Sequence, residues 1–327
     1  MWKTKMERAS IGFFPTPLEP LTQLTAELGG PELWIKRDDQ TGLATGGNKT
    51  RKLEFLIGDA LAQGADGVMT CGAAQSNHAR QTAAAAAKAG LACTLVLRGG
   101  EPAKTQGNLL LDRLLGADVV WAGDEPLLEK MERVAEELRA QGRRPYVITY
   151  GGSDPVGATG YVVAMEELLA QCAEREISFD HIVFATSSGG TQAGLVVGAR
   201  ALGFTGRVLG ISIDLKVEPL RSSLAALATA TAEYLGLDFT FGPDDLDVED
   251  GYLGGGYGVM GELEREAIRT MASAEGILLD PVYTGRAFGG LMDLIRRGAL
   301  EPQERVLFWH TGGTTAVFAY ADELSAT

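Results

Sequence analysis

Short apolar runs alternate with longer amphipathic runs along this chain of 327 residues, and the alternation constrains the fold more than any other feature of the sequence. Short apolar runs bounded by polar turns indicate buried strands, and longer runs with helical periodicity indicate helices. Strands and helices that alternate in this way form a parallel sheet with helices on both faces. The expected strands are 67–71, 92–97, 119–121, 146–149, 181–186, 207–213 and 306–310, and the expected helices are 77–89, 106–115, 125–141, 156–172, 191–202 and 263–275.

The alternation falls into two series, which the turn-rich segment 149–155 separates. Because a domain usually has about 150 residues, the length of the chain suggests two domains. We expect a small domain over residues 51–151 and a large domain formed by residues 1–50 and 152–327.

Charge and composition exclude several classes of protein. Asp and Glu number 43 against 29 Lys and Arg, so the formal net charge is −14, which repels nucleic acid and anionic lipid. Three cysteines and three histidines without paired spacing predict neither a disulfide framework nor a metal site. Residues 1–12 lack the apolar run of a signal peptide, and no apolar run reaches the roughly 18 residues of a membrane span. We therefore expect a cytoplasmic protein that binds neither nucleic acid nor membrane.

Lys49 is the first candidate for chemistry, because it follows the glycines of the segment Gly46-Gly47-Asn48. Glycines let the backbone approach a ligand closely. A partly desolvated lysine has a lowered pKa and can form a Schiff base with a carbonyl group. The alternative is a surface turn with a solvated lysine, but the other lysines have no comparable glycine-rich neighbourhood.

Two turns between an expected strand and an expected helix are suited to anions, because helix N-termini present free N–H groups and a positive dipole end. The turn with Ser76 and Asn77 could clamp a carboxylate, or either residue could simply be the helix N-cap. The small residues of segment 188–191 could form a backbone nest for a phosphate, or only pack tightly. Two tyrosines in late polar turns, Tyr257 and Tyr283, could be acid–base groups or could only satisfy one hydrogen bond each.

These features together fit one ligand. A Schiff-base lysine, an anion-binding helix start and a phosphate nest suit a cofactor with an aldehyde and a phosphate that reacts with amino acids. That cofactor is pyridoxal 5'-phosphate (PLP).

The motifs resemble those of the D-cysteine desulfhydrase and 1-aminocyclopropane-1-carboxylate deaminase family, which are PLP enzymes of fold type II, like tryptophan synthase β. The resemblance covers nearly the whole chain. It implies two open, twisted, mostly parallel α/β sheets with flanking helices, the cofactor in the cleft between the domains, and a homodimer. The matching stretches are 15–18, 35–39, 46–49, 75–78, 280–285 and 310–313.

The resemblance also implies a role for each candidate residue, with Lys49 as the residue that forms the internal aldimine. The implied catalytic residues are Lys49, Ser76, Tyr257 and Tyr283. The implied cofactor-binding residues are Lys49, Asn77, Ser188, Gly189, Gly190, Thr191 and Thr311. The implied substrate-binding residues are Gln75, Ser76, Asn77 and Thr284, and no metal ligand is implied.

Thr284 distinguishes branches within the family. Ring-opening deaminases carry a glutamate directly after the late tyrosine, whereas the desulfhydrases carry a threonine, as here. A carboxylate would stabilise a protonated pyridinium ring, and a hydroxyl favours a neutral ring, which suffices when the leaving group is good. We therefore expect elimination from a small β-substituted amino acid, first of all D-cysteine, to pyruvate, sulfide and ammonia. The alternatives are 1-aminocyclopropane-1-carboxylate deaminase, L-cysteate sulfo-lyase, and a PLP-binding protein with negligible turnover.

Overall fold

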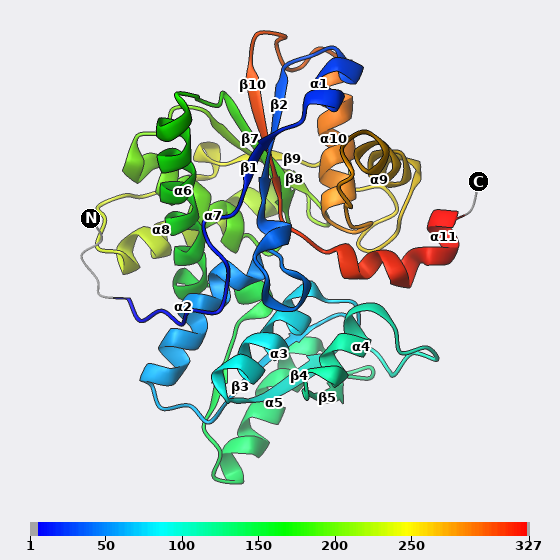
Figure 1. Ribbon diagram of the computed structural model, residues 1–327. Coiled ribbons are helices and arrows are strands. Elements are labelled where there is room, and N and C mark those ends of the chain that lie inside the picture. Colours follow the sequence, from blue (N-terminus) through cyan, green and yellow to red (C-terminus); the bar gives the residue numbers. More distant parts are fainter. Residues whose placement is uncertain (1–5, 326–327) are drawn as a thin grey trace.

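The strands of the protein form two separate sheets in the computed structural model, which describes residues 6–325 (Figure 1). The larger sheet has the order β1-β2-β10-β7-β8-β9, and the smaller has the order β5-β4-β3-β6. Strand β1 runs antiparallel to β2, and the other neighbouring strands are parallel. The expected α/β fold with two mostly parallel sheets is confirmed. Residues 1–5 and 326–327, which belong to the predicted large domain, lie outside the described residues, as does part of segment 1–12.

The strands and helices have the following bounds. The larger sheet contains β1 (Leu18–Pro20), β2 (Glu32–Arg37), β7 (His181–Thr186), β8 (Arg207–Ser212), β9 (Asp247–Glu249) and β10 (Arg305–His310). The smaller sheet contains β3 (Gly67–Gly72), β4 (Ala92–Leu97), β5 (Asp118–Trp121) and β6 (Pro145–Val147). The helices are α1 (Thr22–Leu28), α2 (Lys49–Ala62), α3 (Asn77–Ala89), α4 (Gly107–Leu114), α5 (Leu127–Ala140), α6 (Pro155–Arg175), α7 (Gly190–Leu202), α8 (Val217–Tyr234), α9 (Glu262–Glu275), α10 (Thr284–Arg296) and α11 (Ala321–Ser325).

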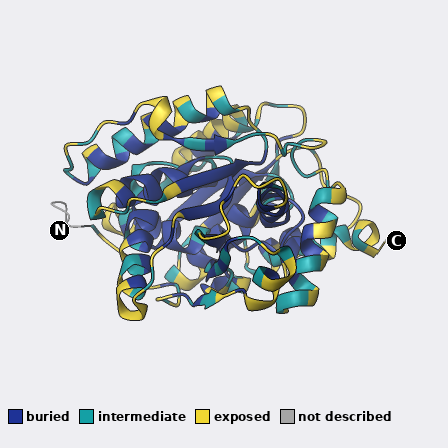
Figure 2. Ribbon diagram, turned by 90° about the horizontal axis from the view of Figure 1, so that it is seen from above, coloured by how far each residue is buried: buried dark blue, intermediate teal, exposed yellow. Residues whose placement is uncertain are grey.

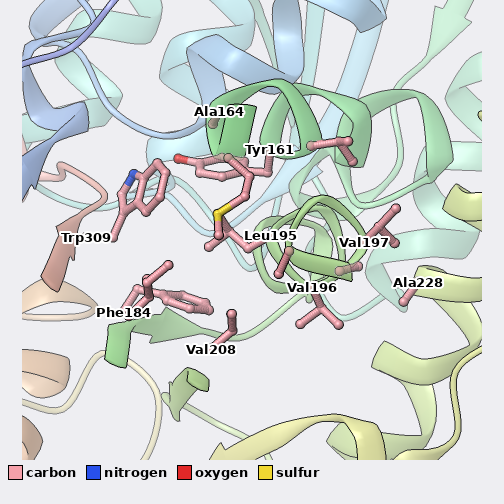
Figure 3. Close-up of a cluster of buried hydrophobic side chains, with 14 of the residues drawn as sticks. Tyr161, Ala164, Phe184, Leu195, Val196, Val197, Val208, Ala228 and Trp309 are labelled. Carbon is pink, nitrogen blue, oxygen red and sulfur yellow. The ribbon is translucent and has the colours of Figure 1, made fainter. Parts of the chain in front are cut away.

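Helices cover both faces of the larger sheet, with α6, α7 and α8 on one side and α9 and α10 on the other (Figure 1). Alternate residues of its strands point to opposite faces. In β7, Phe184 packs in the cluster under α6 and α7, and Val183 packs in the cluster under α10. Figure 3 shows the first cluster, in which Tyr161, Phe184 and Trp309 surround the side chains of α7. The sheet is buried, and the exposed residues lie on the outer sides of the helices (Figure 2).

Helix α2 links the two sheets, because it packs against α3, which follows a strand of the smaller sheet, and against α6, which covers the larger sheet. The strands of the smaller sheet all lie between residues 67 and 147, and those of the larger sheet lie outside that range. The division into domains at residues 51 and 151 stays a prediction. Within residues 6–325, no helix combines the length and the apolar composition that a membrane span requires.

Candidate active site

A pocket lies where segments from both sheets meet, and its walls come from the residues that follow β3, β7 and β10 and from the first residues of α2 and α3. Ligands of open parallel sheets bind at the carboxyl ends of the strands, where these loops lie. The pocket brings together the predicted residues Lys49, Ser76, Asn77, Ser188, Gly189, Thr191, Tyr283 and Thr311. The predicted residues Gln75, Gly190, Tyr257 and Thr284 do not line it.

Lys49 is the first residue of α2, and two tight loops hold it at the pocket. Gly47 has a φ of 128°, and Gly312 in the opposite loop has a φ of 90°. A Cβ atom on Gly312 would lie 2.7 Å from the Cα atom of Gly47, so the two loops touch through their glycines. The N–H group of Asn48 donates a hydrogen bond to the carbonyl of Thr311 at 2.9 Å, which ties the start of α2 to the loop after β10.

The ammonium group of Lys49 is destabilised at this position. Desolvation lowers the pKa of Lys49 to about 8, although a hydrogen bond with Lys52 acts in the opposite direction. A substantial fraction of this amine is therefore neutral near pH 8, and a neutral amine is the form that attacks a carbonyl carbon.

The part of the pocket next to Lys49 is suited to an anion, and Lys52 and Ser153 contribute to it. Nζ of Lys52 donates to the carbonyl of Gly151 at 3.1 Å and to Oγ of Ser153 at 3.3 Å, and neither of these acceptors carries a charge. Oγ of Ser153 also accepts from the N–H group of Gly190 at 3.1 Å, at the start of α7. A Cβ atom on Gly190 would lie 2.7 Å from Nζ of Lys52 and 3.0 Å from the Cα atom of Ser153, so both residues pack closely against the start of α7.

This arrangement fits the phosphate of PLP. Burial and the charge of Lys49 hold the pKa of Lys52 well below its usual range. A dianion beside Lys52 would offset both effects, and the positive end of the α7 dipole points to the same place. Lys52, Ser188, Gly189 and Thr191 can therefore hold the phosphate, with Asn48 donating to Oγ1 of Thr191 at 3.0 Å.

Ser76 is both an N-cap and a pocket residue. Its Oγ accepts from the N–H group of Ala79 at 3.2 Å, which leaves the hydroxyl hydrogen free to donate into the pocket. Oδ1 of Asn77 accepts from Asn108 at 2.9 Å, which orients the Asn77 amide. The amide of Gln75 instead holds the start of α4, because it accepts from the N–H group of Asn108 at 2.9 Å.

The tyrosines and Thr284 occupy different positions relative to the pocket. Tyr283 lines it, and the hydroxyl of Tyr257 lies 2.7 Å from the hydroxyl of Tyr283, just behind the wall. Burial raises the pKa of both tyrosines, so both are neutral hydroxyls at neutral pH. The hydroxyl of Thr284 is buried, donates to Oδ1 of Asp280 at 2.8 Å and accepts from the Asp280 N–H group at 2.8 Å.

Several pocket residues are absent from the sequence prediction. Tyr150 lies in the segment that the sequence indicated only as a crossing between the two series, and Cys71 lies in the buried strand β3. Ser187 directly precedes the predicted phosphate nest. Lys52 follows Lys49 by three residues, so both lie on one side of α2. Because the sequence analysis did not predict α2, this spacing did not indicate Lys52 as a site residue.

The comparisons with known proteins agree with this geometry. The family described as "Pyridoxal-phosphate dependent enzyme" matches residues 9–312. The chain is 43% identical to the D-cysteine desulfhydrase of Salmonella newport and 42% identical to the 1-aminocyclopropane-1-carboxylate deaminase of Burkholderia vietnamiensis, with 97% of each chain covered in both cases.

Solved structures show the same relationship. A crystal structure described as an ACC deaminase homologue superposes with a TM-score of 0.90 at 44% identity, covering 98% of this chain and 96% of the other. A threonine deaminase of known crystal structure shares the fold, with a TM-score of 0.64 at 22% identity over 91% of this chain and 92% of the other. With the Lys49 pocket and matches along nearly the whole chain, the protein belongs to the family of pyridoxal-phosphate dependent enzymes.

Proposed function

We propose that the protein eliminates the β-substituent of a small amino acid, with D-cysteine as the first candidate substrate. The products would be pyruvate, sulfide and ammonia. One observation carries the proposal: an amine with a pKa of about 8, on Lys49, shares one pocket with the first residues of two helices that are suited to anions. The start of α7 suits the phosphate of the cofactor, and the start of α3 suits the carboxylate of the substrate.

The bound cofactor supplies stabilisation of negative charge at Cα of the substrate. The residues of the chain supply orientation and proton transfer. Lys52 and residues 188–191 hold the phosphate of the cofactor, and Asn77 holds its pyridine ring. The hydroxyl of Ser76 and the free N–H groups at the start of α3 hold the substrate carboxylate. The neutral Nζ of Lys49 takes the proton from Cα, since a base with a pKa near the working pH transfers protons most effectively.

Ring opening of 1-aminocyclopropane-1-carboxylate is the second candidate, because relatives that are 42% to 44% identical are described as such a deaminase or as its homologue. Thr284 favours elimination over ring opening. A threonine offers no carboxylate to a pyridinium nitrogen, and the hydroxyl of Thr284 is engaged with Asp280.

The experiment is a panel of D- and L-amino acids and 1-aminocyclopropane-1-carboxylate, assayed with the cofactor-loaded protein for keto-acid release. Pyruvate from D-cysteine supports the proposal, and 2-oxobutyrate from the cyclopropane supports the second candidate. A protein that binds the cofactor with negligible turnover would release neither, which would contradict both.

We further propose that the protein is a cytoplasmic homodimer with its cofactor in the cleft between a small domain (51–151) and a large domain (1–50 and 152–327). The family resemblance supports the dimer and the domain division. The three cysteines are buried and unpaired, which suits a reducing compartment. Light scattering in solution measures the oligomeric state.

A further inference from the structure

We infer that Ser187 and Asp214 select the charge of the substrate's β-substituent: they accept a neutral or cationic hydrogen-bond donor, such as a thiol or an ammonium group, and disfavour an anion such as a sulfonate. The inference rests on the proposed function and deepens it, because it concerns the group that is eliminated. It assigns these two residues to recognition of the substrate and no bond-breaking step to them.

The two residues meet at the carboxyl edge of the larger sheet. Strands β7 and β8 are parallel neighbours in which Thr186 pairs with Ser212, so the residues that follow them emerge side by side. Oγ of Ser187 donates to Oδ2 of Asp214 at 2.9 Å. Ser187 lines the pocket, and Asp214 lies directly behind it.

This hydrogen bond fixes what Ser187 can offer to a ligand. A serine hydroxyl has one hydrogen and two lone pairs. Since the hydrogen of Ser187 points to Asp214, its oxygen can present only lone pairs to the pocket. Ser76 is the opposite case, because its oxygen accepts from Ala79 and its hydrogen is free. The pocket therefore has a donor side for a carboxylate and an acceptor side for a different group.

Asp214 adds a negative charge to the acceptor side. Its Oδ1 atom is buried and accepts no hydrogen bond from another described residue. Burial raises the pKa of the carboxyl, although hydrogen bonds from Ser187 and from its own N–H group act in the opposite direction. A carboxylate that is only partly compensated keeps a negative charge behind Ser187, so a donor that meets the Ser187 oxygen would be favoured and an anion there would be repelled.

The nearby cation does not cancel this charge. Arg286 lies within reach of Asp214, but its guanidinium pairs with Glu264 at 2.5 Å and donates to the carbonyls of Ile213, Gly256 and Val259. The charge of Asp214 also acts on the pocket: burial raises the pKa of Tyr150, a wall residue, and Asp214 raises it further, although the charge of Arg98 acts in the opposite direction.

The cations of the pocket already have partners in the proposed function. Among the described wall residues, the lysines are Lys49 and Lys52, and there is no arginine. Lys49 would hold the cofactor's aldehyde carbon, and Lys52 would hold its phosphate. Burial keeps the pKa of His78 well below its usual range, so this side chain is neutral. Among the described wall residues, no further cation is therefore available to pair directly with a sulfonate at Ser187, which places L-cysteate behind cysteine as a substrate.

The test compares three β-substituents on the cofactor-loaded protein, each as both enantiomers: the thiol of cysteine, the ammonium group of 2,3-diaminopropionate and the larger sulfonate of cysteate. Because the sulfonate differs in size as well as in charge, the change in preference between wild type and the charge variant decides the inference. Two quantities are measured for each compound, kcat/KM for pyruvate release and the apparent Kd from titration of the visible spectrum. The variant is Asp214→Asn, with Asp214→Ser as a second variant if the first does not take up the cofactor. Asp124→Asn is the matched control, because it removes one negative charge from an exposed position.

We expect the wild type to prefer cysteine or 2,3-diaminopropionate over cysteate. Asp214→Asn should raise the cysteate-to-cysteine ratio by about tenfold or more, and Asp124→Asn should leave it within about twofold. A wild type that prefers cysteate, or an Asp214→Asn ratio within twofold of wild type, overturns the inference. If no compound yields a keto acid, the proposed elimination fails, and the ratio of Kd values still decides the role of Asp214 by the same criterion.

Discussion

The hydroxyl groups of Tyr257 and Tyr283 lie 2.7 Å apart, and their rings meet edge to face with centroids 6.0 Å apart. Only Tyr283 lines the pocket, so Tyr257 acts on a substrate through its neighbour. We expect Tyr283→Phe to lower kcat/KM by roughly 10- to 100-fold and Tyr257→Phe by less, since the latter removes one neutral hydrogen bond worth about 1 kcal/mol. The double variant should lose little more than Tyr283→Phe alone. Steady-state kinetics of the three variants measures this, and additive losses would show that the two hydroxyls act separately.

Arg286 holds the loop that carries Tyr257. Its guanidinium is buried, pairs with Glu264 at 2.5 Å and donates to the carbonyls of Gly256 and Val259 on either side of that tyrosine. Removing one partner of a buried pair leaves an uncompensated charge, so Arg286→Met should lower the free energy of unfolding by about 3–5 kcal/mol.

Arg296 on the same helix provides the control. It pairs with Glu266 at 2.6 Å, but both side chains are about half exposed, so Arg296→Met should cost less than about 1 kcal/mol. Urea unfolding measures both variants. Arg286→Lys keeps the positive charge but has fewer N–H donors for the carbonyls beside Tyr257. We expect this variant to fold while its kcat/KM falls. Equal unfolding free energies for the variants at 286 and 296 would contradict this account.

The lowered pKa of Lys49 predicts a pH dependence. The pKa is about 8, and the neutral amine is the reactive form, so reactivity rises as the pH passes upward through 8. In cofactor-free protein, acylation of Lys49 should reach half of its maximal rate near pH 8. Ordinary exposed lysines, with a pKa of about 10.4, should lag by about two pH units. Mass spectrometry of peptides after brief labelling measures both. Borohydride treatment of the loaded protein should attach the cofactor to Lys49, and a label on another lysine would contradict the assignment.

Lys52 should matter for the phosphate of the cofactor and for no other part of it. Lys52→Gln should weaken the binding of PLP by roughly 10- to 150-fold, because a hydrogen bond to a charged group contributes about 1.5–3 kcal/mol. The binding of pyridoxal, which lacks the phosphate, should change little. Titration of the visible spectrum with both compounds measures the two affinities. An equal loss for both compounds would place Lys52 in the fold or at the ring rather than at the phosphate.

Ser76 should act on the substrate and not on the cofactor. Ser76→Ala removes the free hydroxyl hydrogen beside the start of α3, so kcat/KM should fall by roughly 10- to 150-fold while the visible spectrum stays the same. Ser76→Thr keeps the hydroxyl and should recover part of the activity. If loss of cofactor explains the whole defect in Ser76→Ala, the residue belongs to the cofactor site or to the fold.

The sequence predicted the central strands well, because β3, β7 and β10 are runs of apolar residues buried on both faces. It did not predict α2. The buried side of α2 includes Arg51, Lys52 and Glu54, and Arg51 pairs there with Asp38 at 2.8 Å. Leu53, Leu56, Ile57 and Ala60 do form an apolar stripe at helical spacing, and all four pack in one core cluster. The signal for α2 was therefore present in the sequence, and the charged residues between these positions made it easy to overlook.

The residues of the site were also predicted only in part. Lys49 and Ser76 were predicted, because each belongs to a local motif whose chemistry is readable from its neighbours. Lys52, Ser153 and the Ser187–Asp214 pair depend on segments that meet only in the folded protein. Gln75 and Thr284 do not line the pocket, because the side chain of Gln75 bonds the start of α4 and that of Thr284 bonds Asp280 in the turn before α10.

The contact between the loops of Gly47 and Gly312 has a consequence for biosynthesis. Strand β10 is the last strand of the described chain, yet it lies between β2 and β7 inside the larger sheet. A growing chain on the ribosome lacks both the centre of this sheet and the loop that holds the start of α2. We therefore expect the amine of Lys49 to acquire its lowered pKa only after β10 and the loop that follows it have been made and folded.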